Sequence, residues 1–297
     1  MVSATIGHGP GQILRIIKAV LRSDIVIAWF ASVYGAVATL IAALFGKRSV
    51  IIVGGVDVAK EREYGYGLWL SPWKSWLVAN ALRRADRVLV VDDSLKHDVV
   101  ERAGYGGDNI EVLPTGYDET VWYPIGKKEQ VVLTVAAVQT MERFMVKGID
   151  LLIETARKLP EVAFLLVGVE RELIGGTTLP PNLELIPPVG QTELLSYYRK
   201  SKVYCQPSRR EGLSNTLCEA MLSGCIPVAT DVGGSAKAVG EMGVIVSPNN
   251  PEELSDGIRR ALLMPQRTGE QGRERIISLF PKSRREQRLL QLMRDLS

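Results

Sequence analysis

Two glutamates, Glu211 and Glu219, stand eight positions apart around a polar loop in the segment 206–220 (QPSRREGLSNTLCEA). An apolar run ends where this segment begins, and Ser214 or Asn215 can cap the helix that follows. The first backbone N–H groups of such a helix form an anion site suited to a diphosphate. Glu219, one turn inside the helix, has a carboxylate that could accept two hydrogen bonds from a ribose diol. The spacing therefore indicates a site for a phosphorylated, hydroxyl-rich ligand.

Glutamates at this spacing are common by chance, and a solvated surface is their ordinary place. The strand, the loop and the capped helix around Glu211 and Glu219 favour the site interpretation instead. Lys147, directly before Gly148 at a predicted helix start, is the cation that could face the diphosphate. Taken alone, Lys147 would be better interpreted as an exposed helix lysine.

The cysteines and histidines give no support for a metal site. Cys205, Cys218 and Cys225 are an odd number without C-x-x-C spacing, and the histidines are His8 and His97. We interpret the cysteines as reduced, mostly buried thiols of a cytosolic protein, and not as a disulfide framework or a zinc site. The two histidines are interpreted as incidental. We therefore expect a site without a metal.

The composition is that of an ordinary globular protein, with 297 residues, 46% apolar and 23% charged. These values exclude a mainly disordered chain, a collagen-like chain and a coiled coil. A net charge of +3 implies no strong polyanion partner, so no nucleic acid is expected. From Arg259 onward the sequence contains ten Lys and Arg residues and only four Asp and Glu residues. A solvated helical face is the preferred interpretation of this basic segment, and a surface that meets anionic lipid or an acidic partner is the alternative.

Residues 25–46 carry no charge over 22 positions, a length that could span a membrane. Their pattern instead predicts a strand over 25–30, a turn, and an Ala-rich helix over 36–45 that ends at Gly46. Another strand, 49–53, follows at once. A strand, a helix and a strand that are all apolar form the βαβ unit of a sheet covered on both faces, so we predict a buried unit. Nothing at Met1 resembles a signal peptide.

Strands alternate with helices along the chain, which is typical of doubly wound parallel sheets. We predict strands at 2–6, 25–30, 49–53, 87–92, 110–113, 131–138, 162–167, 183–186, 203–206, 226–229 and 243–246. We predict helices over 12–22, from Pro72, and over 148–158, 192–200, 216–223, 251–263, 269–279 and 283–296. A polar linker at 124–130 divides the series. The predicted architecture is α/β, with Rossmann-like domains at 1–127 and 128–281 and a ligand cleft at the carboxyl ends of their strands.

The glutamate segment and residues 223–234 (SGCIPVATDVGG) resemble the donor-binding core of retaining GT-B glycosyltransferases. The resemblance is to glycosyltransferase family 4, also described as glycosyl transferases group 1, which includes sucrose synthases and bacterial mannosyltransferases. Residues 147–153 (KGIDLLI) resemble the Lys-Gly helix start of that family. The similarity is strong over 131–265 and weaker over 24–124.

The resemblance implies a hexosyltransferase-type enzyme that moves a sugar from a UDP- or GDP-linked donor to an acceptor hydroxyl with retention of configuration. Such enzymes use no metal or other cofactor, so cationic side chains and helix N-termini stabilise the leaving diphosphate. It implies that Lys147 is that cation, that Glu211 holds hydroxyls of the donor sugar, and that Glu219 holds the ribose. The residues placed beside the phosphates or the sugar are Ser214, Asn215, Thr216 and Leu217. The implied acceptor is a glycan or a lipid-linked molecule, handled in the cytoplasm, with peripheral contact to the inner face of the membrane as an extension.

The donor side departs from the family pattern at one place. Relatives carry an Arg directly after a Val-Gly in the loop before the lysine. Here that place reads VAAV at 135–138, and the loop to Lys147 is several residues longer. Arg143 is the candidate substitute, on position alone.

The acceptor side departs more. Relatives often have a His after the second apolar strand, where this chain has Gly54, Gly55, Val56 and Asp57. The two glycines allow close approach of a ligand to the backbone, and Asp57 could face the acceptor. A turn or N-cap role is the alternative for Asp57.

The first domain is expected to be short, either naturally or because N-terminal residues are missing. The glycine-rich stretch 7–11 could stand in for the loop with which relatives touch donor and acceptor. The helix over 282–297 is expected to return to the first domain, as in the family.

Three alternatives remain beside the transferase. A nicotinamide oxidoreductase needs a G-x-G-x-x-G turn, which Gly7, Gly9 and Gly11 do not complete because position 12 is Gln. A sugar-nucleotide epimerase has the same two-domain shape but no motif here. A non-catalytic or truncated sugar-nucleotide-binding relative is favoured by the short first domain and the missing Arg.

Overall fold

The computed structural model describes residues 11–297. The predicted strand at 2–6, His8, and the glycine-rich stretch up to Pro10 lie outside the described residues. The chain forms two compact units. Unit 1 comprises residues up to Pro114 together with Ser283–Ser297, and unit 2 comprises Thr115–Lys282. The units divide between Pro114 and Thr115, and the predicted boundary at 127/128 lies further along the same connecting segment, which contains no helix or strand.

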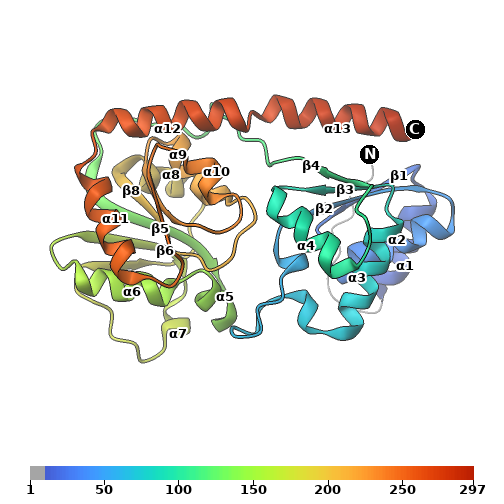
Figure 1. Ribbon diagram of the computed structural model, residues 1–297, viewed down its shortest axis with the longest axis horizontal. Helices are drawn as coiled ribbons and strands as arrows, with labels where there is room; N and C mark the ends of the chain where they lie inside the picture. The colour runs from blue at the N-terminus through green and yellow to red at the C-terminus, as the bar shows by residue number, and fades with distance from the viewer. Residues whose placement is uncertain (1–10) are drawn as a thin grey trace. The chain divides into compact units, whose positions relative to one another are not determined.

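Unit 1 is a four-stranded parallel sheet in the order β1-β2-β3-β4. The strands are β1 (Ile25–Trp29), β2 (Arg48–Val53), β3 (Arg87–Val90) and β4 (Ile110–Val112). The helices are α1 (Gly11–Leu21), α2 (Val33–Leu44), α3 (Pro72–Arg84), α4 (Asp93–Ala103) and α13 (Lys282–Leu296), with short 3-10 turns at Val56–Val58 and Leu68–Leu70. Figure 1 shows α2, α3 and α4 on one face of this sheet and α13 on the other. The apolar segment 25–46 forms β1 and α2, so the buried βαβ prediction is confirmed.

The helix α13 closes the core of unit 1. Its Leu292 packs with Val50, Ile52 and Leu89 of the sheet. Arg285 on the same helix donates to the carbonyl oxygens at the end of β4. The C-terminal segment is therefore part of the first domain, as the resemblance implies. No helix within residues 11–297 is both long and apolar enough to cross a bilayer.

Unit 2 is a six-stranded parallel sheet in the order β10-β9-β8-β5-β6-β7. Its strands are β5 (Glu129–Val138), β6 (Ala163–Val169), β7 (Leu183–Ile186), β8 (Ser201–Gln206), β9 (Ile226–Thr230) and β10 (Val244–Val246). Its helices are α5 (Met141–Val146), α6 (Ile149–Lys158), α7 (Arg171–Ile174), α8 (Gln191–Lys200), α9 (Asn215–Leu222), α10 (Ser235–Val239), α11 (Pro251–Leu263) and α12 (Gln266–Leu279). Helices cover both faces of this sheet (Figure 1), and most of its strand residues are buried. Both units are thus parallel-sheet α/β domains, as predicted, and the strand order of unit 2 contains the reversal that defines a doubly wound sheet.

The strand order of unit 2 places its ligand edge. From β5 the chain adds β6 and β7 on one side, and then crosses to add β8 on the other side of β5. In an open α/β sheet, ligands bind outside the carboxyl ends of the two strands at such a switch point. In unit 2 these are the ends of β5 and β8, at Val138 and Gln206.

Candidate functional site

Two loops leave the sheet at this edge, and they carry the residues that the sequence singles out. The loop after β5 contains α5 and leads to Lys147 and Gly148. The loop after β8 contains Ser208 and Glu211 and leads to α9. Because β5 and β8 are neighbours in the sheet, residues about sixty positions apart along the chain meet here.

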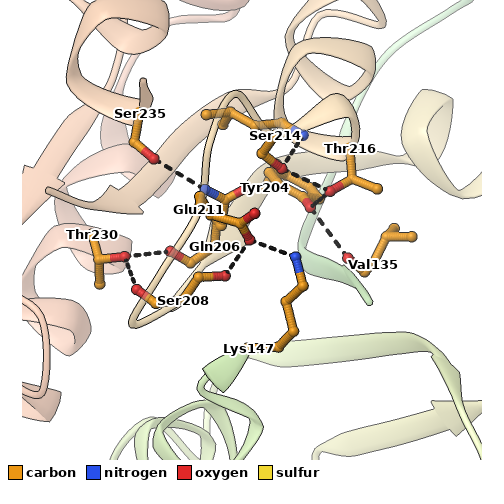
Figure 2. Close-up of polar contacts among 11 residues, drawn as sticks. Val135, Lys147, Tyr204, Gln206, Ser208, Glu211, Ser214, Thr216, Thr230 and Ser235 are labelled. Carbon is orange, nitrogen blue, oxygen red and sulfur yellow. Dashed lines mark hydrogen bonds and ion pairs between the residues drawn. The ribbon is translucent and has the colours of Figure 1, made fainter. Parts of the chain in front are cut away.

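Lys147 and Glu211 form an ion pair at the centre of the site. The Lys147 Nζ lies 2.6 Å from Glu211 Oε1, and the Ser208 hydroxyl donates to the same oxygen at 2.8 Å (Figure 2). The side chains are 32% and 11% exposed, respectively, so the pair borders solvent and is not sealed in the core. A cation and a carboxylate at this edge can hold a diphosphate and sugar hydroxyls.

A close backbone approach fixes the position of Lys147. Gly148 caps α6 with a positive φ of 66°, and a Cβ there would lie 2.0 Å from the carbonyl oxygen of Pro207. Only glycine permits this approach. The Lys-Gly pair of the sequence therefore brings the β5 loop directly onto the end of β8.

The N-terminus of α9 forms the wall beside this pair. Ser214 is its N-cap, and its hydroxyl accepts from the Leu217 N–H at 3.4 Å. The Thr216 hydroxyl receives a hydrogen bond from Tyr204 at 2.7 Å, and the exposed Asn215 accepts one from Tyr117 at 3.0 Å. Leu217 is fully buried, so its side chain belongs to the core and only its backbone lies near the helix start.

A small pocket joins the two loops. Its free volume is about 10 Å³, which is about the room that one water molecule needs. It is lined by Thr134, Val135, Ala136, Lys147, Tyr204, Gln206, Pro207, Ser208, Glu211 and Thr216. A larger hollow of about 310 Å³ in unit 2, beside Arg157 and Pro180, contains none of the predicted site residues. We assign the site to the small pocket because the charged pair and the helix start meet there.

Glu219 faces the interior of unit 2 from α9. Its Oε2 accepts a hydrogen bond from the Tyr198 hydroxyl at 3.3 Å. Burial raises the pKa of Glu219 to about 7, and the Tyr198 bond opposes this rise. Glu219 can therefore change its charge near neutral pH.

Arg143 lies on the short helix α5, which the sequence analysis did not predict. Thr140 caps this helix, with its hydroxyl accepting from the Arg143 N–H at 3.4 Å. Within residues 11–297 the Arg143 guanidinium makes no hydrogen bond or ion pair. The longer loop that the sequence showed before Lys147 is thus a helical turn, and the role of Arg143 stays a prediction.

Asp57 lies in unit 1, and its contacts are those of a turn residue. It is 1% exposed, and its carboxylate accepts from the N–H groups of Ala31 at 2.9 Å, Gly55 at 2.8 Å and Gly54 at 3.2 Å. At Gly54, one of the two glycines, the predicted opening is filled, because the Phe30 ring packs where a Cβ would stand. The geometry favours the turn alternative for Asp57, and its acceptor role stays a prediction without a supporting contact.

Two groups of residues at the site escaped the sequence analysis. Arg209 donates through both of its terminal nitrogens to Asp150, each at 2.7 Å, and its backbone N–H donates to Val146 at 2.7 Å. These bonds tie the β8 loop to α5 and α6. Behind the pocket, the Gln206 amide donates to Ser235 at 3.1 Å and the Thr230 hydroxyl donates to the Ser208 carbonyl (Figure 2). Polar residues at the ends of β8 and β9 were the signal for the second group.

The described residues form no candidate metal site. Within residues 11–297, no three side chains among His, Cys, Asp and Glu gather in a way that would bind an ion. All three cysteines are buried and free. Burial raises the pKa of Cys205 and of Cys218 to about 12, so these thiols are not nucleophiles at neutral pH.

Comparisons with known proteins cover both units. The model of the family described as glycosyl transferases group 1 matches residues 123–277, and that of glycosyltransferase family 4 matches residues 3–121. A D-inositol 3-phosphate glycosyltransferase of Nocardiopsis dassonvillei is 28% identical over 62% of this chain and 49% of its own length. An alpha-maltose-1-phosphate synthase of Mycolicibacterium smegmatis is 27% identical over 91% of this chain and 78% of its own. The chain thus spans about half the length of the first relative and more of the second.

Solved structures share the fold. Sucrose-phosphate synthase of Thermosynechococcus elongatus superimposes with a TM-score of 0.79 at 19% identity, covering 96% of this chain and 78% of its own. The HepE protein (Alr3699) of Anabaena, solved in complex with UDP-glucose, gives a TM-score of 0.80 at 14% identity, covering 96% and 82%. At such identities the likeness concerns the fold alone.

Proposed function

The chain belongs to the glycosyl transferases group 1 family, and on that premise we propose that it transfers a sugar from a nucleoside-diphosphate sugar to an acceptor hydroxyl. The observation that carries the proposal is the Lys147–Glu211 pair beside the N-terminus of α9, at the switch point of unit 2. Family membership gives the reaction class, and this geometry supports Lys147, Glu211 and the start of α9 as the groups that the proposed reaction would use.

The proposed mechanism rests on charge. When the bond between the sugar and the diphosphate breaks, negative charge develops on the leaving phosphate oxygen. Lys147 and the first N–H groups of α9 would stabilise this charge in a metal-independent reaction, and Arg143 would add a second cation. Glu211, freed from Lys147 by the ligand, would accept hydrogen bonds from the donor sugar, and Glu219 would hold the ribose. Retention of configuration is part of the proposal.

The proposed donor is a UDP- or GDP-linked sugar. One neighbour in fold was solved with UDP-glucose, and the names of two relatives specify a phosphorylated inositol and maltose 1-phosphate. These names support a sugar nucleotide as donor and a polar hydroxyl compound as acceptor, and a glycan or a lipid-linked acceptor stays within the proposal.

A cytoplasmic location and contact with a membrane stay proposals as well. The argument from the basic C-terminal segment is weakened, because at least six of its ten cations are engaged within their own unit: Arg259, Arg273, Arg275, Lys282, Arg285 and Arg288. Arg273 and Arg275, for example, donate to backbone carbonyl oxygens.

The test combines two variants with a matched control. Glu211→Gln should lower the turnover of the cognate donor about 100-fold or more while nucleotide binding persists. Lys147→Met should weaken nucleoside-diphosphate binding about tenfold, because a charge-assisted contact is lost. Lys200→Met, which removes an exposed lysine paired with Glu129 at 3.5 Å, should change neither quantity.

Metal independence is tested in the same assay with EDTA. Turnover should be unchanged, and a requirement for an added divalent cation would contradict this part of the proposal. The anomeric configuration of the product, measured by NMR, tests retention. A wild type that binds UDP or GDP but transfers sugar to no acceptor would favour the non-catalytic alternative.

A further inference from the structure

Glu219 has unusually neutral surroundings for a carboxylate that lies partly buried. The titratable groups that face it are Tyr198 of α8, Tyr204 of β8, Tyr117 before β5 and Cys218 of its own helix. All of these groups are uncharged at neutral pH, and burial raises the pKa of each further. Within residues 11–297, no cation forms an ion pair with Glu219, and its one side-chain hydrogen bond comes from the Tyr198 hydroxyl.

Tyr198 is itself held rigidly. Its side chain is fully buried, and its ring meets Trp122 edge-on at 5.6 Å and Tyr204 at 6.1 Å between ring centroids. Because the side chain is fully buried, its hydroxyl is directed at Glu219 and not at solvent.

The backbone around Tyr198 is tied to α9 as well. Lys128 Nζ donates to the carbonyl oxygens of Tyr198 and Ser223, both at 2.6 Å. Ser223 is the C-cap of α9, the helix that carries Glu219. A buried ammonium group therefore links the C-terminal part of α8 to the end of α9. Two connections therefore hold the Tyr198 phenol near the Glu219 carboxylate. One is the direct hydrogen bond, and the other is the Lys128 bridge between the two helices.

We propose that Tyr198 is the positioning residue of the nucleotide site: its hydroxyl fixes the Glu219 carboxylate in the orientation and in the ionised form that a ribose diol requires. This inference rests on the proposed function, in which Glu219 holds the ribose. A phenol that donates to Oε2 occupies one lone pair and leaves Oε1 and the outer lone pairs to accept from the two ribose hydroxyls. A protonated Glu219 would offer a donor where the diol needs an acceptor.

The consequence is a pH dependence of nucleotide affinity with a definite sign. With a pKa of about 7, Glu219 loses its charge as the pH falls below neutrality, so the affinity should decline there. The Tyr198 bond lowers this pKa. Removing the bond should therefore move the decline to a higher pH.

The experiment measures Kd by calorimetry from pH 5.5 to pH 8.5, for UDP and 2′-deoxy-UDP, or for the GDP pair where wild type prefers GDP. The variants are Tyr198→Phe and the control Tyr197→Phe, whose phenol is directed at Glu193 on the outside of the same helix. Tyr198→Phe should weaken UDP binding about tenfold at pH 7 and raise the pH midpoint by about one unit, since one pKa unit corresponds to a tenfold change. The loss for 2′-deoxy-UDP should be smaller.

The outcomes separate the two proposals. If wild type binds no nucleoside diphosphate at any pH, the proposed function fails and this inference fails with it. If wild type binds and Tyr198→Phe has the same pH profile as Tyr197→Phe, only the positioning role is overturned. Should Tyr198→Phe not fold, 3-fluorotyrosine at position 198 provides a more acidic phenol. The pH midpoint should then move downward, and an unchanged midpoint would overturn the role.

Discussion

Asp57 and Glu211 are both carboxylates beside turns, and their neighbouring atoms separate their roles. Three backbone N–H groups take up the oxygens of Asp57, which is 1% exposed. Glu211 faces Lys147 and Ser208, side chains that a ligand can displace without leaving backbone groups unpaired in the core. At the residue scale, Glu211 is therefore the carboxylate that we propose for binding, whereas the observed contacts of Asp57 are those of a structural group of unit 1.

The role of Asp57 can be measured by its removal. Asp57→Ala should lower the free energy of unfolding of unit 1 by about 3 kcal/mol, because buried N–H groups of Ala31, Gly54 and Gly55 lose their acceptor. Denaturant unfolding measures this change. Asp24→Asn, at a fully exposed carboxylate, is the control and should change stability by less than about 0.5 kcal/mol.

Nucleotide affinity is the second readout for Asp57. The folded Asp57→Ala variant should bind the nucleoside diphosphate as wild type does, since the contacts of Asp57 lie wholly in unit 1. A variant with unchanged stability but lost sugar transfer would restore the acceptor-side role.

At the scale of elements, the site depends on two loops that are joined by main-chain contacts. The β5 loop and the β8 loop meet where Gly148 lies against the Pro207 carbonyl and where Arg209 pairs with Asp150. The helix α5 lies within the first loop and carries Arg143. The spacing between the lysine and the glutamate is therefore a property of this junction.

Gly148→Ala should disturb the junction and, through it, the binding of the diphosphate. The variant combines a strained positive φ with a Cβ that would stand 2.0 Å from a carbonyl oxygen. We expect a loss of more than about 2 kcal/mol in thermal or denaturant stability. We also expect nucleotide affinity to fall, because Lys147 moves with its neighbour. Gly176→Ala, where a Cβ meets nothing within 4 Å, is the matched control. Equal affinities for the two variants would show that the junction does not position Lys147.

At the scale of the whole molecule, the chain closes its first unit with its last helix. Strands β1 to β4 come from the first 114 residues, but the core on one face of their sheet is completed by α13. Unit 1 can therefore reach its final stability only after the C-terminal segment has been made.

Leu292→Ala tests this closure. The residue is 2% exposed in the core of unit 1, and its truncation should cost about 2 to 4 kcal/mol. Hydrogen exchange should quicken in β2 and β3 while nucleotide binding in unit 2 is retained. Leu290→Ala on the same helix, where the side chain is 51% exposed, should leave exchange unchanged. Faster exchange in unit 2 alone would contradict the assignment of α13 to unit 1.

Much of the fold follows from local patterns. The predicted strands from residue 25 onward and the predicted helices are all present, because apolar periodicity, caps and glycines act between neighbours in the chain. The helix α4 (Asp93–Ala103) and the short helices α5, α7 and α10 were not predicted, and the short ones contain too few residues to show a period. The loop, the N-cap at Ser214 and the Lys-Gly start were also visible before the fold was known.

Contacts between distant residues were decided by the tertiary structure alone. Lys147 meets Glu211 because β5 and β8 are neighbours in the sheet, and no local pattern specifies a strand order. The partner of Glu219 on α8 and the three N–H groups around Asp57 depend on the same packing. Residue types and spacing thus determined which groups could act, while the assembly of the sheets determined which groups face one another and how strongly each is buried. The physical reason is that hydrogen bonding and desolvation depend on distance in space, whereas periodicity depends on distance along the chain.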